Sequence, residues 1–273
     1  MPASDSPLRI VMAQLGSVSD KRANYEKAAA AVERSATRYQ AQMVVFPEIF
    51  MSYFPVGTPI ETIVEDAETL EGPFTAQLRE LASRFRTWLV FGMKEKLPNR
   101  SDRVYNTVVV VSDDGEVAGV YRKTHLYDAF GFRESDSIEP GPVLFDPIDT
   151  PFGKLGVFVC YELRFPEIAR YQALRGADII VVPSGWVRGP MKEFHWTNLV
   201  TTRALENTLY VVACNQASDF YTGQSLIVDP MGVQLVTGPE SEALIPCEID
   251  LGRIASVRKT LPSHRHRRTE LYT

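Results

Sequence analysis

Short apolar runs alternate with amphipathic stretches along the first half of the chain. Apolar residues recur at three- and four-residue steps between Lys21 and Gln40, which predicts an amphipathic helix there. Gly72-Pro73 opens a second stretch with helical spacing, since proline is favoured in the first turn of a helix. Buried strands are predicted at residues 8–15, 43–46, 88–93 and 104–111, and a hairpin turn at 113–115 leads into a strand at 117–121.

The second half of the chain repeats this alternation. Helices are predicted at residues 166–175 and 193–207. Strands are predicted at residues 155–160, 179–182, 209–213, 224–228, 233–236 and 243–249. The alternation of strands and helices predicts a layered α/β fold, and the hairpins favour mixed sheets over all-parallel ones.

The chain has 273 residues, of which 45% are hydrophobic and 23% charged, the composition of an ordinary globular protein. No low-complexity linker separates the two halves, so we expect residues 1–273 to form a single domain. The formal net charge of -5 argues against a basic surface that recruits nucleic acid. The one basic run, at residues 264–268, is interpreted as a solvated tail or a subunit contact, with a polyanion site as the alternative.

Three widely spaced cysteines, Cys160, Cys214 and Cys247, argue against a disulfide framework. The N-terminal residues 1–10 contain no apolar segment of the kind that a signal peptide needs. No apolar run reaches the roughly 18 residues of a membrane span. We therefore expect a cytoplasmic protein with free thiols and no membrane partner.

Glu48, Lys123 and Cys160 each follow an apolar run that is predicted to be a strand. In α/β folds, reactive groups gather where strands end, because the loops open a crevice there. Each residue alone has a simpler explanation: a buried cysteine is usually a small core residue, and a charged residue after a strand is usually a cap or is solvated. Their order along the chain and their flanking residues make the functional interpretation stronger.

The flanks are Phe46-Pro-Glu-Ile-Phe50, Tyr121-Arg-Lys-Thr-His-Leu126 and Val159-Cys-Tyr-Glu-Leu-Arg-Phe-Pro-Glu167. Together they resemble the nitrilase superfamily, the carbon–nitrogen hydrolases. The resemblance runs from about Leu8 to Tyr272 and includes Tyr105-Asn-Thr107, Arg203-Ala-Leu-Glu206 and Val228-Asp-Pro-Met-Gly232. It implies a four-layer α-β-β-α sandwich with two mixed β-sheets, assembled as a homodimer or a higher homo-oligomer.

By this resemblance, Glu48 is the general base, Lys123 the electrostatic stabiliser and Cys160 the nucleophile. The chemistry is consistent, because a thiol is a poor nucleophile at neutral pH until a base takes its proton. An ammonium group nearby stabilises the thiolate and then the oxyanion of a tetrahedral intermediate. The backbone N–H of Tyr161, directly after the nucleophile, is interpreted as a second oxyanion donor.

Glu134, in Phe132-Arg-Glu-Ser135, matches the position of the family's auxiliary glutamate. The match implies that it holds Lys123 and orients the substrate amide, and a solvated loop carboxylate is the alternative. Glu162 and Arg164 are interpreted as members of structural ion pairs beneath the site and not as catalysts.

Three other classes of protein are alternatives to this interpretation of the sequence. A Cys–His protease would use His125 or His195 as its base, but the papain-type Cys-Gly-Ser-Cys flank is absent. A metal enzyme is disfavoured because no His-Glu-x-x-His or Cys-x-x-Cys spacing occurs, so neither a metal nor an organic cofactor is expected. A catalytically silent relative kept for binding is disfavoured because all three triad residues are present.

Within the superfamily, the segment after Cys160 resembles the amidase branch that cleaves small ω-amides and deaminated glutathione. Tyr161 stands where nitrilases proper tend to carry tryptophan, which favours amides as substrates. A nitrilase and an N-carbamoyl hydrolase remain the alternatives within the superfamily.

Two loops are predicted to line the substrate pocket. Trp186 and Trp196, with Phe130 and Phe132 from the lysine loop, form an apolar wall that limits the acyl group to a small one. Arg133, Arg188 and Lys192 lie in the same loops, and a cation there suits a carboxylate at the far end of a small amide. The alternative is that these cations are solvated charges at the rim.

Overall fold

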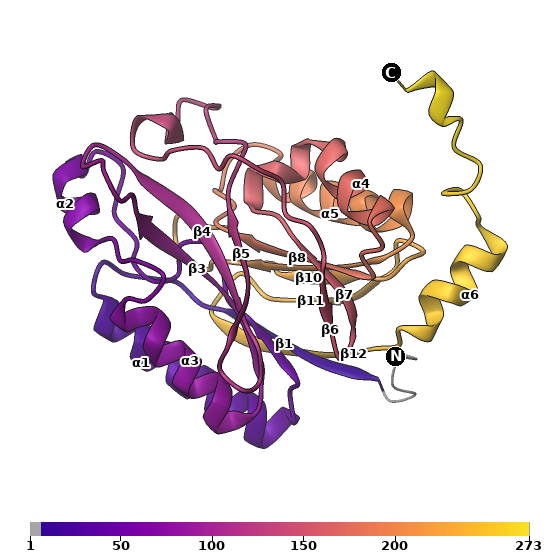
Figure 1. Ribbon diagram of the computed structural model, residues 1–273, viewed down its shortest axis with the longest axis horizontal. Coiled ribbons are helices and arrows are strands. Elements are labelled where there is room, and N and C mark those ends of the chain that lie inside the picture. Colours follow the sequence, from indigo (N-terminus) through magenta and orange to yellow (C-terminus); the bar gives the residue numbers. More distant parts are fainter. Residues whose placement is uncertain (1–6, 273) are drawn as a thin grey trace.

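The computed structural model describes residues 7–272; residues 1–6, which entered the interpretation of the N-terminus, and Thr273 lie outside the described residues. The strands form two six-stranded sheets. The first sheet has, in spatial order, β12 (Ala243–Ile249), β1 (Leu8–Gln14), β2 (Met43–Val45), β3 (Trp88–Lys96), β4 (Val104–Val111) and β5 (Val117–Arg122). The second has β11 (Gln234–Thr237), β10 (Leu226–Val228), β9 (Tyr210–Asn215), β8 (Ile179–Ser184), β7 (Gly153–Val157) and β6 (Ile148–Thr150) (Figure 1).

Both sheets follow the same plan, in which parallel central strands are bordered by antiparallel strands. In the first sheet β1, β2 and β3 run parallel, while β12 and β4 are antiparallel to their neighbours. In the second sheet β7, β8 and β9 run parallel, while β6 and β10 are antiparallel to theirs. The prediction of mixed sheets is confirmed. Because β5 is antiparallel to β4, it runs in the same direction as β2 and β3, so the loops after β2 and β5 leave the sheet at the same edge.

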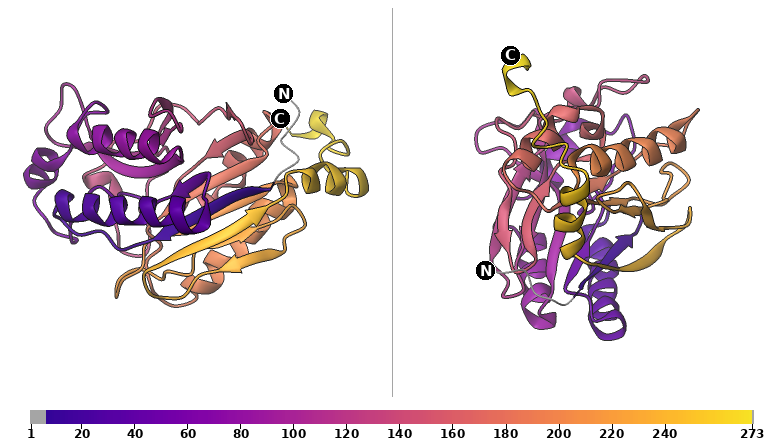
Figure 2. Two further views of the ribbon diagram at one scale, coloured as in Figure 1. Left: turned by 90° about the horizontal axis from the view of Figure 1, so that it is seen from below. Right: turned by 90° about the vertical axis from the view of Figure 1, so that its right-hand side faces the viewer.

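Helices cover the outer faces of the two sheets. α1 (Lys21–Tyr39) and α3 (Pro73–Phe85) pack on the first sheet, and α4 (Pro166–Leu174) and α5 (Lys192–Asn207) on the second (Figure 1 and Figure 2). α1 begins after Asp20, whose carboxylate accepts hydrogen bonds from two backbone N–H groups of the first turn. The arrangement is the four-layer α-β-β-α sandwich that the family resemblance implied.

Alternate residues of the strands face two different parts of the core. Ile10 and Met12 of β1 lie between the sheets, whereas Val11 and Ala13 lie against α1 and α3. All four side chains are fully buried. Burying a side chain of the larger kind contributes about 1.5–3 kcal/mol to stability. The core between the sheets is continuous and draws residues from both of them.

Most predicted elements are present, with their ends shifted by a few residues. Three short elements have no counterpart in the predicted pattern: α2 (Ile60–Asp66), β6 and α6 (Gly252–Thr260). The strand predicted at 155–160 is wrong at its end, because β7 stops at Val157 and Cys160 begins a 3-10 helix. The residues between them are fully buried core residues, so hydrophobicity alone did not mark where the strand ends.

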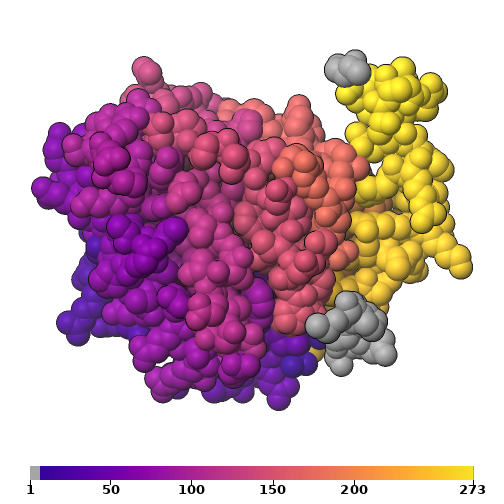
Figure 3. Space-filling model, viewed as in Figure 1, coloured from indigo at the N-terminus to yellow at the C-terminus, as the bar shows by residue number. Residues whose placement is uncertain are grey.

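The C-terminal segment lies along one side of the molecule. α6 and the residues after it, yellow in Figure 3, stand beside the main body. His264 is 3.0 Å from the hydroxyl of Thr208, the residue that ends α5, and Arg258 donates to the same hydroxyl. The basic run is therefore attached to the body at its first residue.

Candidate active site

Three loops bring Glu48, Lys123 and Cys160 to one place. Glu48 lies in the turn after β2, Lys123 directly follows β5, and Cys160 lies three residues after β7. The three residues are 5%, 2% and 8% exposed. They line one cavity, together with Glu134. The structure thus brings together all four residues that the family resemblance singled out.

The carboxylate of Glu48 is held from three directions. One oxygen, Oε1, accepts hydrogen bonds from Lys123 Nζ at 2.9 Å and from Asn106 Nδ2 at 2.7 Å. The other, Oε2, accepts one from the backbone N–H of Gly185 at 2.7 Å. Asn106 lies on β4 and also donates to Glu134 Oε1 at 3.1 Å. Three donors fix the position of the Glu48 carboxylate beside the thiol.

The backbone next to Glu48 needs room that only glycine leaves. Gly92 of β3 passes so close that an added Cβ would lie 2.3 Å from the backbone nitrogen of Ile49. Ile49 itself has a φ of 47°, which is unusual for a β-branched residue. Strained backbone of this kind persists where packing imposes it and is common at active sites. Gly92 therefore allows the Glu48 turn to sit directly against β3.

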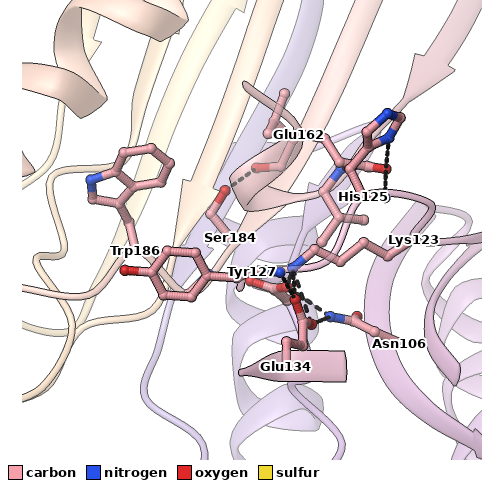
Figure 4. Close-up of polar contacts among 12 residues, drawn as sticks. Asn106, Lys123, His125, Tyr127, Glu134, Glu162, Ser184 and Trp186 are labelled. Carbon is pink, nitrogen blue, oxygen red and sulfur yellow. Dashed lines mark hydrogen bonds and ion pairs between the residues drawn. The ribbon is translucent and has the colours of Figure 1, made fainter. Parts of the chain in front are cut away.

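Lys123 lies between two carboxylates. Its Nζ is 2.9 Å from Glu48 Oε1 and 2.8 Å from Glu134 Oε2, and Glu134 Oε2 also accepts the backbone N–H of Tyr127 (Figure 4). Burial by itself lowers the pKa of Lys123, but the charges of Glu134 and Glu48 outweigh it and hold that pKa well above its usual value. The ammonium group is therefore charged throughout the neutral pH range.

Cys160 begins the 3-10 helix Cys160–Arg164 with a φ of 46°, in the left-handed region. Burial, and then the negative charge of Glu48, raise the pKa of this thiol well above its usual value, while Lys123 opposes them. The resting group is accordingly a neutral thiol beside a carboxylate. Within residues 7–272, the N–H of Tyr161 makes no hydrogen bond, as is normal for the first turn of a helix. That N–H is thus free to donate to a substrate oxygen.

Glu162 joins the cysteine loop to the lysine loop. Its Oε1 accepts from the hydroxyl of Tyr121 at 2.7 Å and from the backbone N–H groups of Thr124 and His125, and its Oε2 accepts from the N–H of Val159 (Figure 4). Burial raises the pKa of this fully buried carboxyl, but the hydrogen bonds outweigh burial and hold the pKa below its usual value.

The interpretation of Arg164 as a member of a structural ion pair is therefore wrong, whereas Glu162 lies 3.7 Å from His125 Nδ1, an ion pair when that imidazole is protonated. Glu162 is satisfied by hydrogen-bond donors from the lysine loop and the cysteine loop, and no ion pair within residues 7–272 includes Arg164. The guanidinium of Arg164 instead lies over the rings of Trp186, Phe130 and Tyr161, at 5.1–5.9 Å from their centroids. The buried Nε of Arg164 has no hydrogen-bond partner in the part of the chain that the structure describes.

Two cavities meet at Cys160. The larger has a volume of about 520 Å³ and is lined by the carboxylates Glu48 and Glu134. The smaller has a volume of about 20 Å³. It is lined by Tyr127, Cys160, Tyr161, Arg164, Gly185, Trp186, Val187 and Lys192, a set that contains two cations and no carboxylate.

Lys192 is the second cation of the smaller cavity. It is 5% exposed, and its Nζ donates to the hydroxyl of Tyr127 at 2.9 Å. Burial, and then the charge of Arg164, lower the pKa of this lysine. No carboxylate within residues 7–272 lies at ion-pair distance from Lys192 or Arg164. A buried cation next to a half-buried one, with no carboxylate of residues 7–272 at ion-pair distance from either, forms a surface that attracts an anion.

Four of the seven predicted pocket residues line a cavity, and three do not. Trp186 and Lys192 line the smaller cavity, while Phe132 and Arg133 line the larger. The structure places the other three elsewhere. Phe130 is 61% exposed, Trp196 is fully buried behind Trp186, and Arg188 pairs with Glu240 at 3.4 Å, so none of them lines either cavity.

The histidines of the protease alternative face other partners. His125 Nδ1 lies 2.8 Å from the Thr124 hydroxyl, and its ring packs at a tilt against that of Phe165. His195 lies beside Arg164. Neither histidine lines a cavity next to Cys160.

Two residues of the site escaped the sequence analysis as functional candidates. Asn106, which binds both carboxylates, lies in the Tyr105-Asn-Thr107 motif, so that motif was the available signal. Lys94 of β3 lines the larger cavity while being only 5% exposed. Its position directly after the apolar run 88–93 was the only sign of it.

Within residues 7–272, no three histidine, cysteine, aspartate or glutamate side chains gather in a way that could hold a metal ion. A search of the same residues finds no helix that is both long and apolar enough to span a membrane.

Comparison with known proteins relates this chain to the carbon–nitrogen hydrolases. The family model described as carbon-nitrogen hydrolase matches residues 9–259. A deaminated glutathione amidase of Escherichia coli is 36% identical over 239 residues, which cover 88% of this chain and 89% of that protein. An omega-amidase of Saccharomyces cerevisiae is 34% identical over 282 residues, covering 97% of this chain and 95% of that protein. The crystal structure of the C. elegans NitFhit protein superimposes with a TM-score of 0.91 at 31% identity, covering 99% of this chain and 67% of that one.

Proposed function

This chain belongs to the carbon–nitrogen hydrolase family, and on that premise we propose that it hydrolyses a small amide through a thioester on Cys160, with Glu48, Lys123 and Glu134 completing the catalytic set. The observation that carries the proposal is the buried contact of Lys123 with both carboxylates beside the thiol. Curated relatives that this chain matches over most of its length are named amidases, which supports an amide over a nitrile.

In the first half of the proposed reaction, the amide carbon accepts the sulfur. Glu48 takes the thiol proton as the C–S bond forms, because the resting thiol is neutral and needs a base. The developing oxyanion lies between Lys123 Nζ and the N–H of Tyr161. The C–N bond then breaks, and the proton held by Glu48 passes to the departing nitrogen.

In the second half, a water molecule attacks the thioester carbon. Glu48 accepts a proton from this water, and the same two donors stabilise the oxyanion. The C–S bond then breaks, and Glu48 returns its proton to the sulfur, which regenerates the thiol and the carboxylate. Glu134 keeps Lys123 in place through its hydrogen bonds to Nζ and positions the lysine loop through the N–H of Tyr127. The protein supplies the first nucleophile, the base and the oxyanion donors, and water is the second nucleophile.

We expect a panel of small amides, nitriles and N-carbamoyl compounds to separate the members of the superfamily. Ammonia release should be fastest from amides, and mass spectrometry of quenched reactions should show an acyl adduct on the intact protein. Faster turnover of nitriles or of N-carbamoyl compounds than of amides would assign the protein to the nitrilases or to the N-carbamoyl hydrolases. If no adduct forms and no compound is turned over, the proposal that this protein is a hydrolase is wrong.

The acyl part of the substrate is proposed to carry a carboxylate that lies between Arg164 and Lys192. The smaller cavity has room for one or two groups of the size of water, about the size of a carboxylate. Charge-assisted hydrogen bonds from guanidinium and ammonium groups suit this anion. The proposal keeps Lys192 from the sequence analysis, replaces Arg188 by Arg164, and leaves Trp186 as the apolar wall.

The test compares Lys192→Met with Arg188→Met on a matched pair of amides, one bearing a distal carboxylate and one its methyl ester. Lys192→Met should raise KM for the acid about tenfold or more, since a hydrogen bond to a charged group contributes roughly 1.5–3 kcal/mol. It should leave the ester nearly unchanged. Arg188→Met is the control, because Arg188 lies four residues before Lys192 and its side chain pairs with Glu240 outside the cavities. This variant should leave KM unchanged for both the acid and the ester. Equal effects on the acid and the ester would contradict carboxylate recognition.

We also propose that residues 1–273 form one domain that assembles as a homodimer or larger homo-oligomer. The core shared by both sheets supports a single domain. Large apolar side chains exposed on the outer helices and the C-terminal segment support self-association: Leu174, Phe194, Leu205, Leu271 and Tyr272.

A further inference from the structure

Three tyrosines of residues 7–272 are more than nine-tenths buried, and they differ in what their hydroxyl groups contact. Tyr121 donates to a carboxylate and Tyr210 to a backbone carbonyl, each at 2.7 Å. Tyr221 is 6% exposed, and its hydroxyl makes no hydrogen bond with any of residues 7–272. A buried tyrosine hydroxyl usually has a partner. The hydroxyl of Tyr221 is therefore available to a molecule that enters the site.

Backbone hydrogen bonds on both sides fix the position of Tyr221. The residue lies between β9 and β10, in a loop that pairs with the loop after β8. The carbonyl of Phe220 accepts the N–H of Arg188, and the N–H of Thr222 donates to the carbonyl of Trp186, both at 3.0 Å. The ring of Tyr221 is thus held between two bonded neighbours, where it forms part of the wall of the larger cavity.

Gly185 places the Tyr221 ring next to the catalytic carboxylate. A Cβ at this glycine would lie 3.0 Å from Cε1 and 3.3 Å from Cζ of Tyr221, so only glycine leaves room for the ring. The same point is 3.3 Å from Oε2 of Glu48, which the N–H of Gly185 holds at 2.7 Å. The carbon that carries the tyrosine hydroxyl is therefore at most about twice 3.3 Å from Oε2. Both residues line the cavity that contains Cys160.

The two oxygens of Glu48 are not equally occupied. Oε1 accepts hydrogen bonds from Lys123 and Asn106, whereas Oε2 accepts one, from Gly185. A carboxylate oxygen has two lone pairs, so Oε2 is the oxygen that can still take a proton. The nitrogen that receives this proton, and the water that later gives one, must come next to Oε2. That is the side of the carboxylate on which the Tyr221 ring lies.

We propose that the hydroxyl of Tyr221 is a catalytic group that accepts a hydrogen bond first from the departing nitrogen and then from the attacking water. The proposal rests on the proposed function, because it uses the same two half-reactions. In the first, the nitrogen takes the proton from Glu48 and gains an N–H, which the tyrosine oxygen accepts. The C–N bond then breaks, and its electron pair leaves with the nitrogen. In the second, one O–H of the water gives its proton to Glu48 while the other donates to Tyr221.

The surroundings of Tyr221 keep its hydroxyl protonated. Burial, and then the acidic side chains of Tyr53, Glu48 and Cys160, raise the pKa of Tyr221 well above its usual value. A neutral hydroxyl can accept a hydrogen bond without competing with Glu48 for the proton that moves. Tyr221 therefore orients the nitrogen and the water, and Glu48 remains the base.

The test is Tyr221→Phe, which removes only the hydroxyl. On the best amide of the panel, kcat should fall about tenfold to a hundredfold, the usual effect of losing a hydrogen bond to a group that carries charge. KM should change less than about twofold, because the bond to the new N–H forms only after the substrate has bound. The thermal midpoint should stay the same, since the hydroxyl has no partner among residues 7–272.

Tyr210→Phe is the matched control. Its hydroxyl donates to the carbonyl of Asp250, on the far side of β9 from the reacting groups in the sequence of contacts, and Tyr210 lines neither cavity at Cys160. This variant should lower the thermal midpoint, because it leaves a carbonyl without its donor, and it should keep the wild-type kcat. The two variants should thus show opposite patterns of activity and stability.

Rapid-quench mass spectrometry separates the two half-reactions, because it follows the formation and the decay of the acyl adduct on Cys160. Both should be slower in Tyr221→Phe than in the wild type. Slowing of only one of them would overturn the claim that the nitrogen and the water use the same hydroxyl.

The other outcomes distinguish this inference from the proposed function. A wild-type kcat in Tyr221→Phe, or a change in KM alone, overturns the catalytic role and leaves the proposed hydrolysis intact. A loss of activity that comes with a lower thermal midpoint assigns Tyr221 to the structure of the loop and overturns the role as well. If the wild type hydrolyses no amide, it is the proposed function that fails.

Discussion

Cys160→Ala is expected to lower kcat by about 10⁴-fold or more, because the thioester route has no substitute for its nucleophile. The acyl adduct seen by intact-protein mass spectrometry should disappear at the same time. Stability should change little, because the substitution removes one small atom from a site that already opens into two cavities. Thermal unfolding measured beside the activity checks this second expectation.

Cys214 offers a matched control for this experiment. It is a fully buried thiol on β9 whose Sγ–H donates to the carbonyl of Val45 at 3.1 Å, in the core between the sheets. Cys214→Ala should cost some stability through the lost packing and hydrogen bond, and it should keep the wild-type kcat. Residual activity above a few per cent in Cys160→Ala, with an adduct retained, would contradict the assignment of the nucleophile.

Lys123→Met is expected to lower both activity and stability. Loss of one oxyanion donor typically costs about 3 kcal/mol in the transition state, or roughly 10²-fold in rate. The substitution also leaves Glu48 and Glu134 facing each other without the cation between them, and breaking a buried pair costs about 3–5 kcal/mol. Unfolding by denaturant should therefore begin at a lower concentration. The variant should regain stability on acidification, because protonation of one carboxyl removes the repulsion.

A second substitution separates the two effects. Adding Glu134→Gln to Lys123→Met removes one of the opposed carboxylates, so it should restore much of the lost stability. It should not restore activity, because the oxyanion donor is still missing. A double variant that regains activity would place Lys123 in a purely structural role. A single variant with wild-type kcat/KM would exclude Lys123 from the reaction altogether.

Several features of the fold could be predicted from local pattern alone. The strand β4 and the helix α1 were found with nearly correct ends, since their periodicity continues along the whole element. Short elements such as α2 were missed because seven residues carry too few periodic positions. The end of β7 was misplaced because the residues that follow it are as buried as the strand.

The candidate catalytic residues could also be identified from the sequence. Glu48, Lys123 and Cys160 were identified by their flanks, and Glu134 by its position after the lysine loop. The flanks are informative because a catalytic side chain needs specific neighbours to hold it. Phe46-Pro-Glu-Ile-Phe50, for example, supplies the tight turn that places Glu48 against Gly92.

Only the tertiary structure decided which cations lie beside the cavities. The sequence analysis favoured Arg188 and Lys192 because they share a loop, yet Arg188 turns to Glu240 while Lys192 turns into the cavity. Arg164 was assigned to an ion pair and Lys94 was overlooked, although both lie beside the cavities and neither has an ion-pair partner among residues 7–272. The direction of a long side chain depends on the backbone angle at its Cα and on partners from segments far away in the chain. Those partners come together only when the two sheets pack, so no local pattern records them.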